Sequence, residues 1–161
     1  MADFLVQSVE RSSEMEAIGY VVLFVYLLVM SVYDIRKGEI QLTISLLAAL
    51  VLLMRQLSLV PGGGIGLSAA FPGVLVGVVL IVVSILTRGE IGIGDGIVFM
   101  VSGLVFGIYE NGVLLFLSLV FTAFVSAILM VAKHVGRKYT LPFVPFVFIG
   151  YGVMCIWKIF S

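Results

Sequence analysis

Charged residues, cysteines and histidines are all scarce in this sequence, and each scarcity excludes a class of protein. Only 11% of the 161 residues are charged, whereas about 25% is usual for a soluble domain. Nine basic residues balance nine acidic ones, so no excess of positive charge favours a nucleic-acid partner. One cysteine and one histidine exclude an intrachain disulfide and any conventional cysteine-histidine zinc site. We therefore expect a protein that uses no metal and no other cofactor.

Apolar residues, by contrast, make up 62% of the chain, and its mean hydropathy is +1.29. Because soluble domains are about 45–50% apolar, the composition predicts an integral protein of the lipid bilayer. We expect an all-α polytopic fold with six transmembrane helices. Residues 1–161 should form a single domain, of which residues 1–16 are a short polar N-terminal segment. The apolar segments are Ile18–Val32, Ile40–Leu57, Ala69–Leu86, Ile97–Ile108, Val113–Ala132 and Phe143–Ile159.

The fourth apolar segment is the shortest, and a polar stretch, Gly92–Gly96, precedes it. Irregular backbone at membrane depth must be covered by protein or line a wet cavity, so this stretch indicates a site where the fourth helix begins. Further along, Gly103 and Gly107 have the small-xxx-small spacing that lets membrane helices approach closely. The sequence YENG, Tyr109–Gly112, is typical of a turn on the outer face.

The basic residues of the short loops predict the orientation, because Lys and Arg are retained on the cytoplasmic side. Six of them fall in the odd-numbered loops and three on the opposite side. We therefore expect a multi-pass protein of the cell membrane with odd-numbered loops in the cytoplasm and both termini outside. The six are Arg36, Lys37, Arg88, Lys133, Arg137 and Lys138, and the three are Arg11, Arg55 and Lys158.

Two aspartates fall on the same predicted face of the membrane. Asp34 follows the first apolar segment and Asp95 precedes the fourth. Acids at membrane depth are costly and usually serve a function. Two carboxylates in one partly desolvated site cannot both ionise readily, so one keeps its proton. The ionised aspartate could then take a proton from a water attacking a carbonyl, while its partner donates one to the oxyanion.

Each aspartate also has an ordinary structural interpretation, which the residues alone leave open. Asp95 stands where the N-cap of the fourth helix is expected, and a helix dipole favours an anion there. Asp34 lies beside Arg36 and Lys37, as is typical of a solvated charge at the membrane interface.

Other residues near the two aspartates are candidates for holding a substrate. Gly92, Gly94 and Gly96 would let the backbone come close to a substrate strand. Glu39 and Glu90 would attract a basic peptide, although both are equally typical of ordinary surface charges.

Three stretches of the chain together resemble a known family. GIGD, Gly92–Asp95, has the GxGD form of membrane-embedded aspartyl proteases. YDIRKGEI, Tyr33–Ile40, resembles the aspartate and basic residues that end the first helix of type IV prepilin peptidases. LPFVPFVFIGY, Leu141–Tyr151, is similar to the last helix of that family. The resemblance covers essentially the whole chain, and it is to the minimal form that serves Tad-type pili.

The resemblance implies an aspartic endopeptidase in which Asp34 and Asp95 are the catalytic pair. It implies that the partner is a prepilin or prepilin-like substrate with a short basic leader. This leader would be cut on the cytoplasmic side of the membrane, just before the hydrophobic helix of the substrate. Neither the resemblance nor the residues specify an oligomeric state.

The sequence departs from the family in three places. Ile97 stands where many bacterial members have a lysine, and Gln41 and Leu42 follow Ile40 where many have a proline and an asparagine. The cysteine-bearing cytoplasmic insert of the larger enzymes is also missing. Because N-methylation of the processed pilin is attributed to that insert, we expect no methyltransferase activity.

Three other families of protein carry similar acids. A presenilin relative has its aspartates on consecutive helices, whereas two apolar segments intervene here. An archaeal preflagellin peptidase uses the same pair of aspartates and stays an alternative. A small proton- or cation-coupled transporter is the alternative outside the enzymes, although its acids would be expected near the midplane of repeated halves, and no repeat is present.

Overall fold

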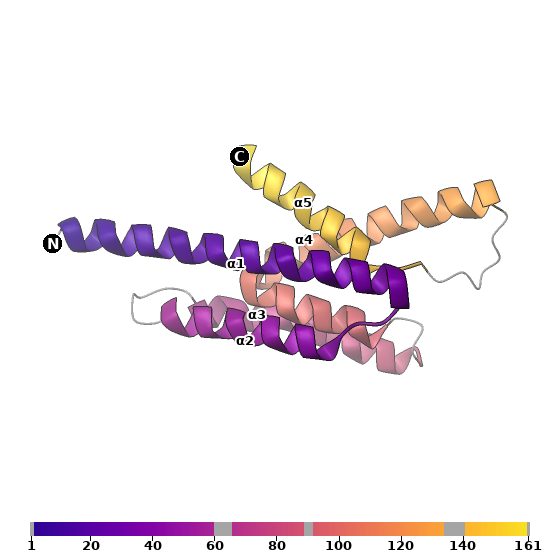
Figure 1. Ribbon diagram of the computed structural model, residues 1–161, viewed down its shortest axis with the longest axis horizontal. Coiled ribbons are helices and arrows are strands. Elements are labelled where there is room, and N and C mark those ends of the chain that lie inside the picture. Colours follow the sequence, from indigo (N-terminus) through magenta and orange to yellow (C-terminus); the bar gives the residue numbers. More distant parts are fainter. Residues whose placement is uncertain (1, 60–65, 89–91, 134–140, 161) are drawn as a thin grey trace.

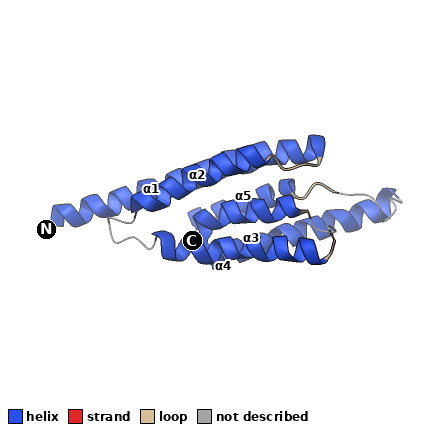
Figure 2. Cartoon of the chain, turned by 90° about the horizontal axis from the view of Figure 1, so that it is seen from below, coloured by secondary structure: helices blue, strands red, loops and turns tan. Residues whose placement is uncertain are grey.

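The computed structural model describes residues 2–59, 66–88, 92–133 and 141–160. Within these ranges the chain contains five helices and no strand, so the prediction of an all-α protein is confirmed (Figures 1 and 2). The helices are α1 (Ala2–Lys37), α2 (Leu42–Leu59), α3 (Gly66–Leu86), α4 (Ile93–Lys133) and α5 (Val144–Phe160).

The prediction of six separate spans is not matched by these helices. By length and composition, two stretches of the described chain could cross a membrane, Glu14–Lys37 of α1 and Ile93–Val131 of α4. The apolar parts of the other three helices are shorter. The fourth and fifth predicted segments both belong to α4, which continues as one element across a break in helical geometry at Gly107.

Helix α4 reverses its direction at Gly107, where the backbone leaves helical geometry with φ 71° and ψ −175°. The side chain of Asn111 shows the reversal, because its Nδ2 donates to the carbonyl of Phe99, twelve residues earlier, at 2.9 Å. In a straight helix these residues would be about 18 Å apart along the axis. Glycine adopts this positive φ without steric cost. The chain therefore turns at Gly107, whereas the predicted YENG turn, Tyr109–Gly112, is helical.

The N-terminal half of α4, residues 93–106, packs against α3 through glycines. A Cβ atom on Gly103 would overlap the backbone of Gly73, and one on Gly77 would overlap the backbone at Gly96. Gly107 also lies against Gly73. The close helix approach predicted from Gly103 and Gly107 is thus confirmed, and it brings α3 against the N-terminal half of α4.

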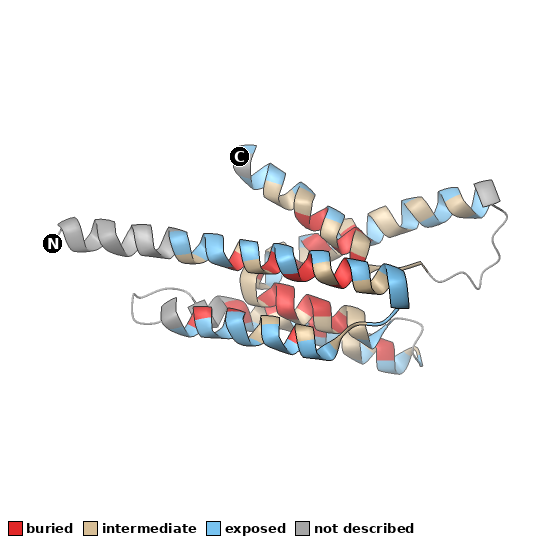
Figure 3. Ribbon diagram, viewed as in Figure 1, coloured by how far each residue is buried: buried red, intermediate tan, exposed pale blue. Residues whose placement is uncertain are grey.

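Buried residues lie where the helices face one another, and the outer faces of the helices are largely exposed (Figure 3). Apolar residues such as Leu46 and Trp157 are 72% and 76% exposed, while Ser102 and Asn111 are fully buried. Asn111 accepts from Ser102 at 2.7 Å and donates to Gly73 of α3 at 2.9 Å. The interior therefore holds the polar bonds between helices, and the outside offers the apolar surface that lipid tails favour.

Helix α2 is attached to its neighbours by polar side chains near its C-terminal end. Arg55, which the sequence placed at the outer end of the second segment, is only 8% exposed. Its Nε donates to the carbonyl of Met15 in α1. Gln56 donates to the carbonyl of Leu104, close to the turn in α4. These two bonds hold one end of α2 between α1 and α4.

Candidate active site

Asp34 lies in the last turn of α1, rather than after the end of the helix as the sequence suggested. Gly38 ends that helix in the left-handed region, with φ 63°, and donates its N–H to the Asp34 carbonyl at 2.9 Å. Arg36 and Lys37 in the same turn complement the negative end of the helix dipole. The sequence IRKG thus carries an ordinary C-terminal stop signal that fixes the position of Asp34.

The half-buried carboxylate of Asp34 binds the first residues of α5. Its Oδ2 accepts the N–H of Val144 at 2.9 Å, and the backbone of Phe143 also donates to the side chain. The first N–H groups of a helix have no partner within the helix, so Asp34 acts as a cap supplied by a distant part of the chain. This contact joins the end of α1 to the start of α5.

Asp95 is the third residue of α4, whereas the sequence suggested the N-cap position. Gly92 precedes the helix, and its carbonyl accepts the N–H of Asp95 at 3.1 Å. The Asp95 carboxylate in turn accepts from the Gly92 backbone. The second of these bonds is the one that a capping box makes from the carboxylate at the third helical position back to the N–H of the N-cap residue. The GxGD spacing therefore fixes the orientation of the Asp95 side chain locally.

The other glycines of the motif allow neighbouring segments to come close to Asp95. A Cβ atom on Gly94 would overlap the side chain of Ile40, which lies between α1 and α2. A Cβ atom on Gly96 would overlap Ile81 of α3. The sequence suggested close approach to a substrate for these glycines, and in the structure they are in contact with the protein itself.

The fold brings Asp34 and Asp95 together at one end of the helix bundle. The charge of Asp34 acts on the carboxyl group of Asp95, so the two acids lie within electrostatic reach of each other. The end of α1 and the starts of α4 and α5 converge there (Figure 1). Two half-buried carboxylates in this arrangement can share a proton and position a water between a base and an acid.

The remaining predicted residues have different positions. Glu39 is exposed in the short connection from α1 to α2, and Glu90 lies outside the described residues. Arg36 and Lys37 are exposed beside Asp34, and the Lys37 ammonium stands 5.5 Å from the ring centre of Tyr33. Among the described residues, no group of three or more His, Cys, Asp or Glu side chains could hold a metal ion.

Sequence reasoning missed the residues that hold the two acids in place. Pro142 before α5 is a recognisable start signal for that helix, but nothing near it predicts that Asp34 is its cap. The sequence marks Ile40 only as the start of an apolar segment, because its contact with Gly94 depends on the packing of α2 against α4.

The helical bundle, its apolar exterior and the paired acids define a membrane protein with an acidic site at one end. The profile of the type IV leader peptidase family matches residues 21–132. This range contains both aspartates and spans more than half of the chain, so the protein belongs to the type IV leader peptidase family and is a peptidase. No curated protein and no solved structure matches the sequence.

Proposed function

We propose that the protein is a prepilin leader peptidase of the aspartic type, in which Asp34 and Asp95 activate the attacking water. The observation that carries the proposal is the approach of these two acids, which lie far apart in sequence and interact electrostatically at one end of the bundle. The substrate is a prepilin or prepilin-like protein with a basic leader, as expected for the minimal, Tad-like form of the family.

In this mechanism the two carboxylates hold one proton between them. The ionised group accepts a proton from water as its oxygen attacks the scissile carbonyl, and the protonated group donates to the developing oxyanion. Collapse of the tetrahedral intermediate breaks the C–N bond and returns a proton to the leaving amine. The bonds from Gly92 to Asp95 and from Val144 to Asp34 support this role, because they fix both carboxylates before substrate arrives.

The proposed site faces the cytoplasm in a multi-pass protein of the cell membrane. The exposed Arg36 and Lys37, in the same helical turn as Asp34, support this orientation because basic residues flank the cytoplasmic ends of membrane helices. The leader of the substrate would therefore be cut before it leaves the cytoplasm. In this proposal Glu39, which is exposed, attracts the basic residues of the leader.

The test is cleavage of a purified prepilin by the purified protein in lipid vesicles, followed as a mobility shift. Asp34→Asn and Asp95→Asn should each abolish the shift, and the double variant should be no worse than either one, because the groups act as a unit. Glu110→Gln is the matched control, since it removes a carboxylate from α4 at a position beyond the Gly107 turn. Retention of substantial turnover by Asp34→Asn or Asp95→Asn would refute the proposal.

A further inference from the structure

The stretch PFVP, residues 142–145, leads into α5, and its two prolines carry no N–H. The N–H groups of Phe146 and Val147, which follow it, bond to the carbonyl of Phe143 at 3.0 and 3.3 Å. Phe143 is thus the N-cap of α5, and Val144 is the first helical residue. The N–H groups of Phe143 and Val144 are therefore the two in this stretch that can bind a distant part of the chain.

Both of these N–H groups, which we call the amide pair, are directed at the carboxylate of Asp34. Val144 donates to Oδ2 at 2.9 Å, and Phe143 donates to the same side chain. Packing fixes the position of the amide pair. The ring of Phe143 lies against that of Phe99 in α4, with ring centres 6.3 Å apart, and Val144 is fully buried. Asp34 thus has two donors that are oriented by the packing of α5 against α1 and α4.

Asp95 receives fewer hydrogen bonds than Asp34. Among the described residues, the backbone of Gly92 is the one donor to its carboxylate. Its place in the first turn of α4 also favours an anion, but a helix dipole contributes less than a direct hydrogen bond to a charged group. At Asp34 the dipoles of α1 and α5 oppose each other, because α1 ends where α5 begins. The number of direct bonds therefore favours negative charge on Asp34.

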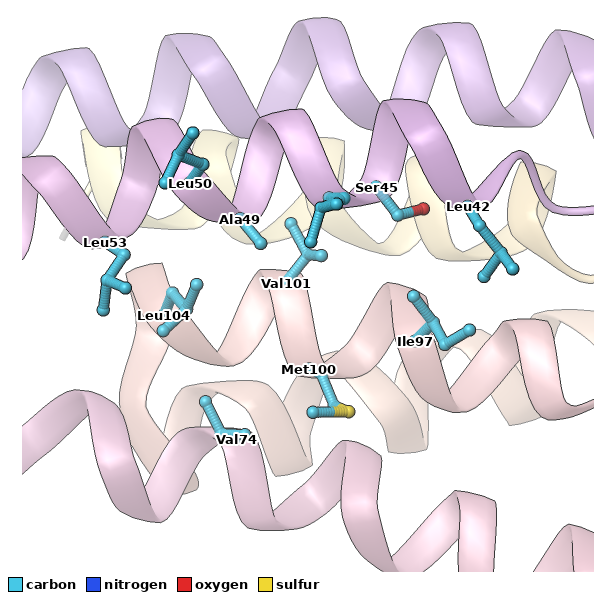
Figure 4. A pocket seen from close by; sticks show the side chains of 11 residues that line it. Leu42, Ser45, Ala49, Leu50, Leu53, Val74, Ile97, Met100, Val101 and Leu104 are labelled. Atoms are coloured by element: carbon cyan, nitrogen blue, oxygen red, sulfur yellow. The ribbon is translucent and has the colours of Figure 1, made fainter.

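The other charged groups that the structure describes at this end of the bundle are exposed to solvent, which screens them. The parts of α2, α3 and α5 at this end, residues 42–50, 77–87 and 144–150, contain no ionisable side chain. An apolar groove of about 660 Å³ between α2 and α4 is lined by none either (Figure 4). The exposed groups are Arg36 and Lys37 in α1, Glu39 after it and Arg88 after α3, and half-buried Tyr33 adds one phenol.

We propose that the amide pair makes Asp34 the ionised base of the catalytic pair and leaves the shared proton on Asp95, which acts as the acid. The inference rests on the proposed function and assigns one role to each aspartate. Phe143 and Val144 are positioning residues in this account, because they act through Asp34 and do not contact the substrate.

With these roles, each proton is back at its starting place after one turnover. Asp34 takes a proton from water as the water oxygen bonds to the scissile carbonyl carbon, and Asp95 gives its proton to the carbonyl oxygen. Asp34 then passes its proton to the amine nitrogen as the C–N bond breaks. The hydroxyl that Asp95 protonated returns that proton to Asp95 as the carbonyl forms again. Asp34 is then ionised and Asp95 protonated, as before the reaction.

Val144→Pro tests this assignment, because it removes one N–H of the amide pair at a position where a helix accepts proline. Proline is favoured as the first residue of a helix, and the extended backbone that it requires of the residue before it suits an N-cap. Val144→Ala is the matched control, since it also trims the buried side chain but keeps the N–H. The measurement is kcat/KM for a purified prepilin in lipid vesicles as a function of pH.

The acidic limb of this profile reports the group that must be ionised, and the basic limb reports the group that must be protonated. In Val144→Pro we expect the acidic limb to move to higher pH by about one unit, because Asp34 loses a hydrogen bond that favours its anion. The basic limb should not move, and Val144→Ala should move neither limb. Movement of the basic limb alone would make Asp34 the acid, and profiles equal to that of Val144→Ala would exclude the amide pair from the mechanism. Either result would overturn the proposal.

Replacement of Val144 by its α-hydroxy acid, which converts the amide into an ester, gives a second measurement should the proline variant fail to insert into the membrane. It deletes the same N–H and keeps the side chain, so the same upward shift of the acidic limb is expected, and an unmoved limb would contradict the proposal. Failure of the unsubstituted protein to cleave any prepilin at any pH would instead refute the proposed function, so the two failures are distinguishable.

Discussion

Substituting Asp34 by asparagine and by alanine separates the two roles of its carboxylate, capping of α5 and proposed catalysis. Asparagine keeps an oxygen that can accept the Val144 N–H, now 2.9 Å from Oδ2. Asparagine and aspartate are about equally good caps, whereas loss of a cap costs about 0.5–2 kcal/mol. Asp34→Asn should therefore have nearly normal stability, and Asp34→Ala should lose about 1 kcal/mol of unfolding free energy.

The rate of cleavage should respond differently. General acid–base catalysis contributes about 10²–10⁴-fold, so both variants should lose at least about a hundredfold in kcat. The measurements are prepilin cleavage and reversible unfolding in mixed micelles, each made on both variants and on the unsubstituted protein. If Asp34→Asn cleaved normally while Asp34→Ala lost activity in proportion to its unfolding, Asp34 would be a structural cap and the catalytic pair would be refuted.

Three further predictions concern the surroundings of the site and the turn in α4. Gly94→Ala should lower kcat at least about tenfold, because the added methyl displaces Ile40 and with it the start of α4, and a misplacement of about 1 Å can cost a hundredfold in rate. Adding Ile40→Ala to this variant should restore part of the lost rate. Gly112→Ala, with nothing within 4 Å of the added Cβ, should be neutral in the same cleavage assay, and equal effects of the two alanines would contradict the packing argument. Asn111→Leu should lower the unfolding free energy by about 1–3 kcal/mol, because it leaves buried polar partners unsatisfied; an unchanged unfolding midpoint would show that the turn does not depend on this amide. Glu39→Gln should raise KM for a basic leader by no more than about fivefold, as for an exposed charge pair, and the effect should disappear at high salt and with an uncharged leader, whereas an equal penalty on both leaders would indicate a structural role.

The sequence predicted the features that depend on composition or on neighbouring residues. The apolar content predicted helices in a membrane, and the spacing of Gly103 and Gly107 predicted close packing. The GxGD stretch pointed to Asp95, whose carboxylate is held by Gly92 only three residues away. These features could be predicted because a capping interaction or an apolar helix face is formed within one or two turns of the chain.

Local reasoning was wrong where a buried contact overrides local preference. YENG has the composition of a turn, yet Asn111 is fully buried in a helix because its amide bonds to α3 and to the N-terminal half of α4. Arg55 was assigned from the sequence only to the outer end of an apolar segment, and its burial against Gly19 of α1 could not be predicted from its neighbours. In both cases the groups that the side chain contacts are distant in sequence. The residues on either side of Asn111 or Arg55 therefore give no sign of these contacts.

The sequence by itself determined that this chain is a helical membrane protein with two acids at helix ends, since these properties are set by hydropathy and by helix start and stop signals. Only the tertiary structure decided that Asp34 and Asp95 lie within electrostatic reach and that Asp34 caps a helix beginning 110 positions later. The physical reason is that these features are formed between helices. Their energies depend on how close α1, α2, α4 and α5 come to one another, and that distance is set by packing across the whole bundle.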